Sequence, residues 1–424
     1  MNIREESIKV LDEVINNKAF SNIVLDKALC NENISQVDKN FITMLVHGVL
    51  QNYYLLDYKI KKLNSKKIKR KVYLILLISI YQLDYMNKIP EYAVINEATN
   101  LTKKVEDNYA SKFVNALLRN YVSNRIEINE NDFNSVSEYL SIKYSTPEFI
   151  IKMLIKQYDL ETTKKILDYT IKSASLNVRV NTFKVSKDEL LKFNEYKEGT
   201  ISNYGLIYKG SNRNLLNEHV KKGLVSIQDE AGQLIAPLLD LKESDYVLDM
   251  TAAPGSKTCH MGELLKNKGK IVAVDLYEHR LELLNKAKNR LGLTNIITKA
   301  YDSTKLSEIY EKESFDKILL DAPCSGLGVI RRKMDIKYNV SPESIDELVS
   351  LQKTLLEEAY SLLKKDGILV YSTCTINKKE NEKQIENFIK NHSDLEVVTQ
   401  KTLLPYEYDT DGFYYCKMIK KGVK

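Results

Sequence analysis

The chain has no tryptophan, and for its length it has few cysteines, histidines, prolines and glycines. Its 424 residues include 5 Cys, 5 His, 7 Pro and 15 Gly. Five scattered cysteines without a repeated spacing do not predict a disulfide framework. The five histidines have no metal-ligand spacing with one another or with cysteine, so we expect no metal site.

Long hydrophobic runs are also missing. No run of about 18 apolar residues occurs, so the sequence predicts no membrane span. The first six residues (MNIREE) include acids and no apolar stretch, so we expect no signal peptide. We therefore expect a cytoplasmic protein. With 43% hydrophobic residues, the chain is long enough for two or three domains with their own cores.

The net charge of +6 is unevenly distributed. Residues 1–125 contain 19 Lys or Arg and 13 Asp or Glu, so the whole surplus lies there. Within them, residues 59–71 (KIKKLNSKKIKRK) hold eight basic side chains and no acid. Such a run is either a solvated lysine-rich helix end or a patch that contacts phosphates. In its domain context we favour RNA as the partner.

The apolar pattern predicts three regions. Residues 1–128 have apolar residues at helical spacing throughout and predict an all-α bundle. Residues 129–235 predict linker helices followed by a small α+β subdomain that faces the substrate. Residues 236–424 alternate short apolar runs with amphipathic helices, which predicts a Rossmann-like, doubly wound parallel sheet.

The strands of this sheet are predicted from short apolar runs. They are residues 246–250, 271–275, 295–299, 316–321 and 367–373, with 395–399 and 413–419 as possible edge strands. In such sheets ligands bind beyond the carboxyl ends of the strands. The loops that follow these runs are therefore where we expect the chemistry.

The segment Asp249–Thr258 (DMTAAPGSKT) follows the first of these strands. Its small residues predict a tight turn into a helix, where backbone N–H groups can approach a ligand closely. The segment lacks the G-x-G-x-x-G pattern of dinucleotide enzymes, which argues against a dehydrogenase. Lys257 is either a solvent-facing lysine or a contact to a cofactor carboxylate or to the target nucleotide.

Aspartates end four successive predicted strands. They are Asp249, Asp275, Asp302 and Asp321. Asp275 suits the two ribose hydroxyls of an adenosine, and Asp302 suits the adenine amino group. One aspartate at a strand end is more often a helix cap. Four in succession favour a site for S-adenosyl-L-methionine.

Two cysteines follow strand ends, where the backbone can orient a thiol and leave it accessible to a substrate. Cys324 lies between Pro323 and the flexible pair Ser325–Gly326, and Cys374 follows the next strand. The two strands are expected to be neighbours, so the two thiols should lie close together. A lone cysteine is usually a buried or inert thiol, and we expect this of Cys30, Cys259 and Cys416.

Two such thiols beside a methyl donor suit a cytosine C5 methyltransferase. Cytosine C5 is a poor nucleophile, and the addition of a thiolate to C6 turns the ring into an enamine that accepts a methyl group. A base must then remove the C5 proton. A nearby Lys or Arg helps to ionise the thiol, and Asp321 is the candidate group to stabilise charge at N3. The residues alone do not decide which thiol attacks.

Four segments resemble the RNA (cytosine-5) methyltransferase family typified by NOL1/Nop2/Sun proteins. They are residues 249–258, 321–326 (DAPCSG), 372–374 (STC) and 179–182 (RVNT). The resemblance implies that Cys374 is the nucleophile and that Cys324 assists product release. It also implies cofactor contacts from Ala252, Ala253, Pro254, Gly255, Ser256, Lys257, Asp275, Arg280, Asp302 and Asp321.

The first region resembles a NusB-like RNA-binding helical domain. The similarity is carried by residues 82–90, by 96–98 (NEA) and by 112–119 (KFVNALLR). A NusB-like domain ahead of this catalytic domain is the arrangement of the bacterial RsmB type, which modifies small-subunit ribosomal RNA. The resemblance therefore implies methylation of C5 of a specific cytosine in 16S rRNA.

Residues 331–338 (RRKMDIKY) are similar to the R-R-H-P-D-I-K-W of that group. The chain departs from the family pattern at Thr251 in place of Cys, at Ser256 in place of Gly, and at Lys333, Met334 and Tyr338 in place of His, Pro and Trp. None of these changes removes a catalytic group. We expect the last three to affect the fit of the substrate.

The sequence leaves two alternatives open. In one, the chemistry is the same and the substrate is tRNA. In the other, the chain is a non-catalytic RNA-binding factor in which only the bundle acts. The sequence does not fix an oligomeric state, and we expect a monomer.

Overall fold

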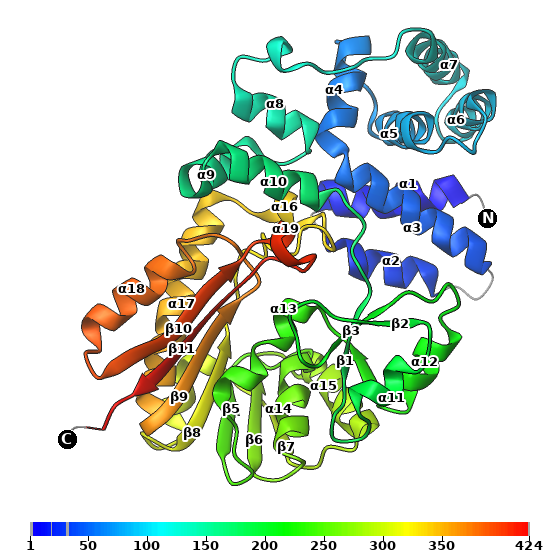
Figure 1. The fold of residues 1–424 in the computed structure, drawn as a ribbon. Coiled ribbons are helices and arrows are strands. Elements are labelled where there is room, and N and C mark those ends of the chain that lie inside the picture. Colours follow the sequence, from blue (N-terminus) through cyan, green and yellow to red (C-terminus); the bar gives the residue numbers. More distant parts are fainter. Residues whose placement is uncertain (1–2, 18, 31–33, 423–424) are drawn as a thin grey trace. The chain divides into compact units, whose positions relative to one another are not determined.

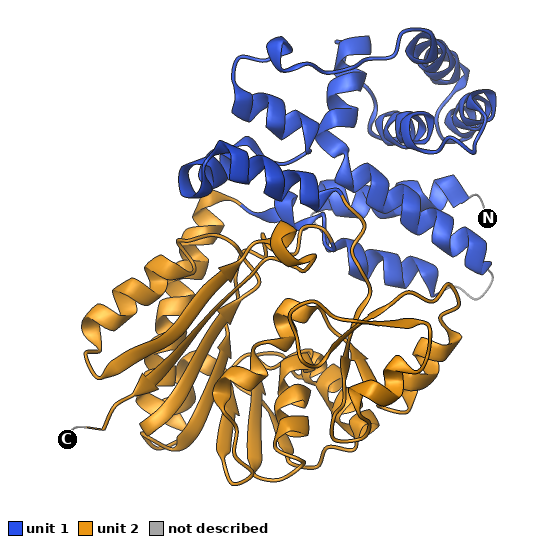
Figure 2. Ribbon diagram, in the orientation of Figure 1, with its two compact units in different colours: residues 1–171, 332–340 blue, residues 172–331, 341–424 orange. Residues whose placement is uncertain are grey.

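A computed structural model describes residues 3–17, 19–30 and 34–422. The chain divides into two compact units, which Figure 2 shows in different colours. Unit 1 contains residues 1–171 and 332–340, and unit 2 contains residues 172–331 and 341–424. The helices that follow the bundle thus group with unit 1, and the small α+β part groups with the large sheet.

Unit 1 is entirely helical over its described residues, as predicted (Figure 1). Its helices are α1 (Ile3–Asn17), α2 (Ser21–Leu29), α3 (Gln36–Gln51), α4 (Tyr53–Leu63), α5 (Arg70–Tyr85), α6 (Glu91–Val105), α7 (Asn108–Ser123), η1 (Glu130–Asp132), α8 (Val136–Lys143), α9 (Glu148–Tyr158), α10 (Leu160–Thr170) and α16 (Ile336–Asn339). Every residue of α5 from Leu74 to Leu83 is buried. A helix that is apolar on all sides must be surrounded, so α5 lies at the centre of the bundle.

Residues 332–340 form a segment, here called the strap, that leaves the sequence of unit 2 and packs within unit 1. Met334 lies in the hydrophobic core of the bundle. The Asp335 carboxylate accepts hydrogen bonds from the backbone N–H of Ser21 at 3.1 Å and from its hydroxyl at 2.6 Å. The strap thereby satisfies the first residue of α2, whose N–H has no partner within its own helix.

Two side chains of the strap bind carbonyl groups at helix ends. The Lys337 ammonium group donates to the carbonyl oxygens of Gln51 and Tyr144, both at 3.2 Å. The Tyr338 hydroxyl lies 2.7 Å from the carbonyl oxygen of Leu50 and 3.0 Å from that of Ser145. Burial lowers the pKa of Lys337 to about 7. The departure from the family pattern at Tyr338 therefore falls in the interior of unit 1.

Unit 2 begins with a small antiparallel sheet of order β2-β3-β1-β4. Its elements are β1 (Asn177–Val180), α11 (Lys187–Leu191), β2 (Tyr196–Glu198), β3 (Gly205–Tyr208), α12 (Asn214–Lys221), β4 (Val225–Ile227) and α13 (Glu230–Gln233). The sequence predicted β1, α11 and β3. It did not predict β2 and β4, because three residues are too few to show an alternating pattern.

The large sheet has the order β10-β11-β9-β8-β5-β6-β7 (Figure 1). Its strands are β5 (Tyr246–Asp249), β6 (Lys270–Asp275), β7 (Ile296–Ala300), β8 (Phe315–Asp321), β9 (Leu363–Thr373), β10 (Leu395–Leu403) and β11 (Phe413–Lys420). Strands β5 to β9 are parallel, and β11 pairs antiparallel with both β9 and β10. The predicted Rossmann-like sheet is confirmed, and both additional strands are present, with β10 at the edge and β11 between β10 and β9.

Helices cover both faces of this sheet. They are η2 (Ala236–Leu239), α14 (Ser256–Leu264), α15 (Glu278–Leu291), η3 (Ser303–Glu308), α17 (Pro342–Leu362), α18 (Glu382–Asn391) and α19 (Pro405–Tyr408). Successive strand residues point to opposite faces. Accordingly Val247 packs in a core with α14 and α15, whereas Leu248 packs in a core with α17 and α18.

The strand order reverses between β5 and β8. From β5 the chain proceeds outward through β6 and β7, then returns to β8 on the other side of β5 and continues to β9. Such a reversal opens a crevice at the carboxyl ends of the central strands. None of the described helices is long and apolar enough to cross a membrane.

Candidate active site

The side chain of Asp249, the last residue of β5, holds the loop that follows this strand. Asp249 is buried and accepts a hydrogen bond from the Thr258 hydroxyl at 2.7 Å. Burial raises the pKa of Asp249 to about 7. The loop turns into α14 at Gly255, which has φ +105°, and a Cβ there would lie 2.7 Å from Cγ of Leu284. Only glycine fits this turn, because both the conformation and the space exclude a side chain.

A cavity of about 360 Å³ lies at the carboxyl ends of β5, β6 and β8. Five of the predicted cofactor residues line it: Ala253, Asp275, Arg280, Asp302 and Asp321. The other five are not part of its described lining: Ala252, Pro254, Gly255, Ser256 and Lys257. Those five belong to the loop and to the first turn of α14.

Asp275 lines the cavity and is hydrogen-bonded to the loop after β5. Its side chain is 4% exposed and accepts a hydrogen bond from the backbone N–H of Ala253 at 3.2 Å. Its other oxygen lies 3.3 Å from Arg280, which also donates to the carbonyl oxygen of Ala253 at 3.3 Å. The carboxylate is thus oriented by the protein and retains lone pairs that can accept ligand hydroxyl groups.

Asp302 caps a helix and also lines the cavity. It caps η3, since it accepts from the N–H and the hydroxyl of Thr304 at 2.9 and 2.7 Å. These hydrogen bonds lower the pKa of Asp302. It also lines the cavity, so the capping role and the binding role are compatible.

The sequence did not point to the apolar residues around this cavity. Leu276, Tyr277 and Leu351 line it and are 55%, 52% and 39% exposed. Large apolar side chains at the edge of a cavity suit the faces of a planar ring. The pair Leu276–Tyr277 directly follows a strand-end acid, where a polar loop is usual, and this was the available signal. Leu351 comes from α17, far along the chain, and nothing in the sequence marks it.

The two predicted thiols lie close together in the structure. Strands β8 and β9 are parallel neighbours with Asp321 paired to Ser372. The sulfur atoms of Cys324 and Cys374 lie 3.4 Å apart, and the two are not joined by a disulfide bond. The prediction that the thiols lie close together is confirmed.

An ion pair lies beside the thiols. The ammonium group of Lys257 lies 2.6 Å from Oδ2 of Asp321, and the Ser372 hydroxyl donates to Oδ1 of Asp321 at 2.7 Å. Burial disfavours the ammonium form, but the negative charges of Asp321 and then Cys374 outweigh it. The pKa of Lys257 is therefore raised, and the side chain remains a cation.

The Cys324 loop is held by a buried acid that the sequence did not reveal. Glu380 is 0% exposed and accepts from the N–H and hydroxyl of Ser325 at 2.8 and 2.5 Å, and from Asn377 at 3.0 Å. The pKa of Cys324 is raised, first by its hydrogen bond with Cys374, then by burial and by the negative charges of Cys374 and Glu380. Glu380 follows two lysines in a polar stretch, which is typical of an exposed turn.

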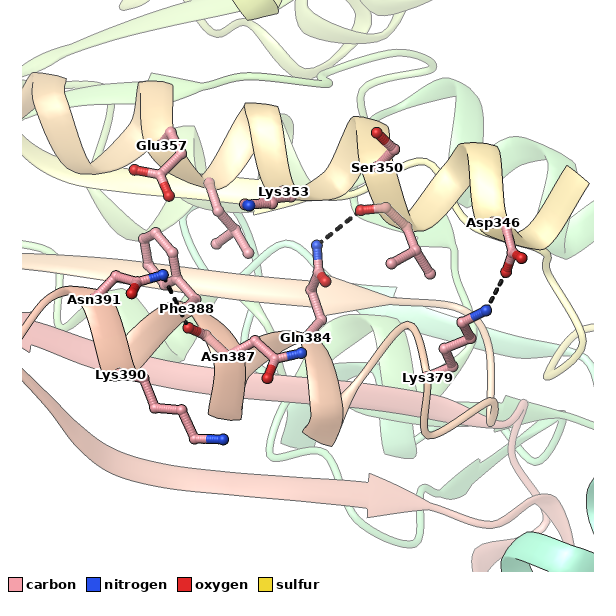
Figure 3. A pocket seen from close by; sticks show the side chains of 12 residues that line it. Asp346, Ser350, Lys353, Glu357, Lys379, Gln384, Asn387, Phe388, Lys390 and Asn391 are labelled. Carbon is pink, nitrogen blue, oxygen red and sulfur yellow. Dashed lines mark hydrogen bonds and ion pairs between the residues drawn. The ribbon is translucent and has the colours of Figure 1, made fainter. Parts of the chain in front are cut away.

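A larger hollow of about 600 Å³ lies elsewhere in unit 2, between α17 and α18. Figure 3 shows its side chains, among them Lys379 paired with Asp346, and Gln384, which donates to the carbonyl oxygen of Val349 at 3.0 Å. None of the predicted site residues lines it. Size alone therefore does not identify the site.

Two family models match the chain. The model of the 16S rRNA methyltransferase RsmB/F matches residues 236–419, and the model of the NusB family matches residues 1–123. A probable ribosomal RNA small subunit methyltransferase B from Bacillus subtilis is 36% identical to this chain over 449 aligned residues. The alignment covers 99% of this chain and 99% of the relative. This chain belongs to the ribosomal RNA small subunit methyltransferase B family.

Other comparisons agree with this assignment to the methyltransferase B family. The ribosomal RNA small subunit methyltransferase B of Photorhabdus laumondii is 30% identical, with 99% of both chains covered. Among solved structures, PH0851 has a TM-score of 0.81 at 24% identity and covers 99% of both chains. NSun6 from Pyrococcus horikoshii with SFG has a TM-score of 0.60 at 22% identity, over 65% of this chain and 99% of the other. These two structures share the fold.

Members of the methyltransferase B family methylate ribosomal RNA of the small subunit, with S-adenosyl-L-methionine as the cofactor. The cavity fits this molecule. The oriented carboxylate of Asp275 suits ribose hydroxyls, and the exposed faces of Leu276 and Tyr277 suit an adenine ring. The predicted cofactor and the predicted NusB-like domain are thus confirmed.

Proposed function

We propose that the protein methylates C5 of a specific cytosine in 16S rRNA through a covalent bond between the Cys374 sulfur and C6 of the base. The observation that carries this proposal is the pair of thiols 3.4 Å apart beside the Lys257–Asp321 ion pair and next to the cofactor cavity. A methyltransferase that acts on an already nucleophilic atom has no need of two adjacent thiols.

The charges around the thiols support different roles for them. Lys257 interacts with Cys374 and favours its thiolate form. Glu380 interacts with Cys324 and disfavours its thiolate form. Thiolate is the nucleophilic form of cysteine. Cys374 is therefore the nucleophile, and Cys324 carries the proton that the two sulfur atoms share.

The reaction begins when the Cys374 thiolate forms a bond to C6 of the cytosine. The Asp321 carboxylate, oriented by Lys257 and Ser372, stabilises N3 as N3 takes up a proton from solvent, and N3 returns this proton to solvent when the bond to C6 breaks. S-adenosyl-L-methionine, when bound, supplies an electrophilic methyl group to C5. The C5 proton must then leave as the bond between Cys374 and C6 breaks, and Cys324 is the group that accepts it.

Cys324 becomes a base only after the covalent bond has formed. In the free enzyme its pKa is raised largely by the hydrogen bond to Cys374 and by the charge of Cys374. When Cys374 is bonded to C6, its sulfur is a neutral thioether and both causes disappear. Cys324 then loses its proton to solvent and can take the proton from C5. Release leaves Cys324 as the thiol and Cys374 as the thiolate, which is the starting arrangement.

The cofactor contacts follow from the cavity. We assign the ribose hydroxyls to Asp275 and the adenine amino group to Asp302. Leu276, Tyr277 and Leu351 would hold the adenine ring. The turn 252–256 and the first residues of α14 present backbone N–H groups to the methionine part.

Transfer of labelled methyl groups to unmodified 16S rRNA and to unmodified tRNA tests this function. We expect incorporation into 16S rRNA at C5 of one cytosine, little into tRNA, and none with Cys374→Ala. Incorporation into tRNA alone would keep the chemistry and replace the substrate. Full activity of Cys374→Ala would contradict the mechanism.

A further inference from the structure

The basic run 59–71 is not one uniform patch of free charge. Half of its eight cations are held by carboxylates: Lys59 by Asp84 at 2.7 Å, Lys61 by Asp57 at 2.6 Å, Lys69 by Glu106 at 2.8 Å, and Arg70 by Asp12. Within the described ranges 3–17, 19–30 and 34–422, Lys66 and Lys67 form no ion pair, and both are exposed. The other two are Lys62 at the end of α4, which lies over the Tyr58 ring, and Lys71 in the first turn of α5, so Lys66 and Lys67 are the two such cations of the loop itself.

A cavity of about 300 Å³ lies beside these two lysines, between that loop and the first turn of α7. Its wall is apolar where Ile68, Ala110 and Phe113 meet, and Lys66 and Lys67 stand at its rim. Tyr109 also lines it and is 84% exposed, which makes it one of the most exposed large side chains described. A tyrosine so exposed contributes little to the stability of the bundle.

The position of these groups is fixed by the fold. Asp107 caps α7, since it accepts from the N–H of Ala110 at 2.7 Å, and this orients the turn that carries Tyr109. The Asn64 side chain donates to the carbonyl oxygen of Lys66 at 2.6 Å, which holds the loop. The Lys69–Glu106 ion pair joins the loop to the end of α6, directly before the Asp107 cap of α7. The aromatic ring and the two cations are therefore presented together.

An apolar recess with an exposed aromatic ring and two unpaired cations has the groups that an unpaired nucleotide requires. The bases of single-stranded RNA stack on aromatic side chains, and lysines contact the phosphates. A double helix conceals the faces of its bases and would use the lysines alone.

We propose that this site binds an unpaired nucleotide of the RNA substrate, with the base against Tyr109 and the adjacent phosphates at Lys66 and Lys67. The inference relies on the proposed function only for the identity of the partner as 16S rRNA. It assigns to unit 1 a contact of its own with single-stranded RNA, in addition to the two thiols of unit 2.

Binding of the full chain to a fluorescent single-stranded fragment of unmodified 16S rRNA tests the proposal. We expect Tyr109→Ala to weaken binding about tenfold, the size of the loss of one base stack. We expect the double variant Lys66→Gln/Lys67→Gln to reduce the slope of log affinity against log salt by about 1.4, as for two lost phosphate contacts to a single strand. All three side chains are exposed, so circular dichroism should show unchanged folding.

Matched controls come from the same unit. Tyr92 on α6 is 75% exposed, and Lys103 is an exposed lysine of the same helix. Tyr92→Ala and Lys103→Gln should bind as the wild type does. Equal losses in these controls, or unchanged binding in the Tyr109 and lysine variants, would overturn the proposal.

A methyl-transfer assay on the same RNA separates this inference from the proposed function. The Tyr109 and lysine variants should raise KM and leave kcat near the wild-type value. If the wild type is active and the variants bind the RNA normally, the proposed nucleotide site is wrong and the proposed function stands. Weaker binding in the variants, with no methyl transfer to rRNA by the wild type, would keep the site and remove the function.

Discussion

Glu380 accepts hydrogen bonds from both the backbone N–H and the hydroxyl of Ser325, at 2.8 and 2.5 Å. Ser325 is the residue after Cys324, so a fully buried carboxylate holds the thiol that we propose as the release base. A buried charge is expensive to keep in a protein unless it is hydrogen-bonded. The acid therefore has two effects, since it fixes the loop and its charge keeps Cys324 protonated in the free enzyme.

Replacement of Glu380 by Gln separates these effects. Loss of the charge removes one cause of the raised pKa of Cys324, so the pH at which release of the methylated RNA from Cys374 becomes half-maximal should move downward. Loss of one hydrogen bond should reduce the maximal rate about tenfold, since a hydrogen bond to a charged group contributes about 1.5–3 kcal/mol. Single-turnover rates measured from pH 6 to 10 check this.

The control for that experiment is Glu382→Gln, two residues further on. Glu382 accepts from the Thr402 hydroxyl at 2.6 Å and, within the described part of the chain, makes no hydrogen bond or ion pair with the Cys324 loop. Its pH profile should match that of the wild type. A lower maximum without a shift in Glu380→Gln would mean that the acid supports the loop and does not act on the thiol.

The strap gives unit 1 a pH-dependent stability. The pKa of Lys337 is about 7 in the folded protein and 10.5 for an ordinary lysine, because burial disfavours the charged form. Between these pH values the unfolded chain binds a proton that the folded chain does not. The free energy of unfolding should therefore rise as the pH rises from about 7 to 10.5. The slope should be at most about 1.4 kcal/mol per pH unit. Below pH 7 both states bind the proton, so Lys337 should cause no change there.

Lys337→Met should remove that rise, whatever its effect at neutral pH. Thermal unfolding midpoints from pH 6 to 10 measure it. The exposed Lys333 of the same strap provides the control, since Lys333→Met should leave the slope unchanged. A slope that persists in Lys337→Met would assign the pH dependence to another group.

Arg179 joins the small sheet to the helix of the cofactor loop. It makes two hydrogen bonds to the Glu263 carboxylate, at 3.1 and 2.8 Å, and donates to the carbonyl oxygen of Ser256 at 2.8 Å. Both side chains are almost fully buried. Arg179→Met should lower the free energy of unfolding by about 3–5 kcal/mol, because it leaves an unpaired buried charge.

The double variant Arg179→Met/Glu263→Met provides the control, because it removes both charges together. It should be more stable than Arg179→Met alone when both are measured by urea denaturation. Equal destabilisation in the two variants would mean that packing, and not the unpaired charge, causes the loss.

Asp275 tests the proposed cofactor contacts. Asp275→Asn should weaken binding of S-adenosyl-L-methionine about tenfold to a hundredfold in calorimetry, since hydrogen bonds to a charged group are lost. Asp316 is the second residue of β8, at the end of the strand opposite to Asp321, and pairs with Lys364 at 2.7 Å. Asp316→Asn should bind the cofactor normally, and equal losses in both variants would indicate a general effect on the sheet.

The sequence predicted those parts of the molecule that depend on neighbouring residues. Each strand of the large sheet appears as a short apolar run, and the order of a doubly wound sheet then brings Cys324 and Cys374 together. The acids Asp275 and Asp302 follow their strands directly, so they too were visible.

Features that depend on contacts between distant segments were not visible. Residues 332–340 pack in unit 1 because Lys337 binds carbonyl groups at the ends of α3 and α8. No local sequence pattern predicts these contacts. Leu351 reaches the cavity only because α17 packs against the sheet. Glu380 lies in a lysine-rich stretch, and its burial follows from hydrogen bonds that form only when the loops after β8 and β9 meet.

Denaturing electrophoresis of the protein with radiolabelled 16S rRNA and S-adenosyl-L-methionine tests the central claim most directly. We predict a covalent protein–RNA complex that accumulates with Cys324→Ala, because its bond to C6 forms and is not released. We predict none with Cys374→Ala or with the double variant. A complex formed by Cys374→Ala, or methyl transfer by that variant, would contradict the assignment of Cys374 as the nucleophile.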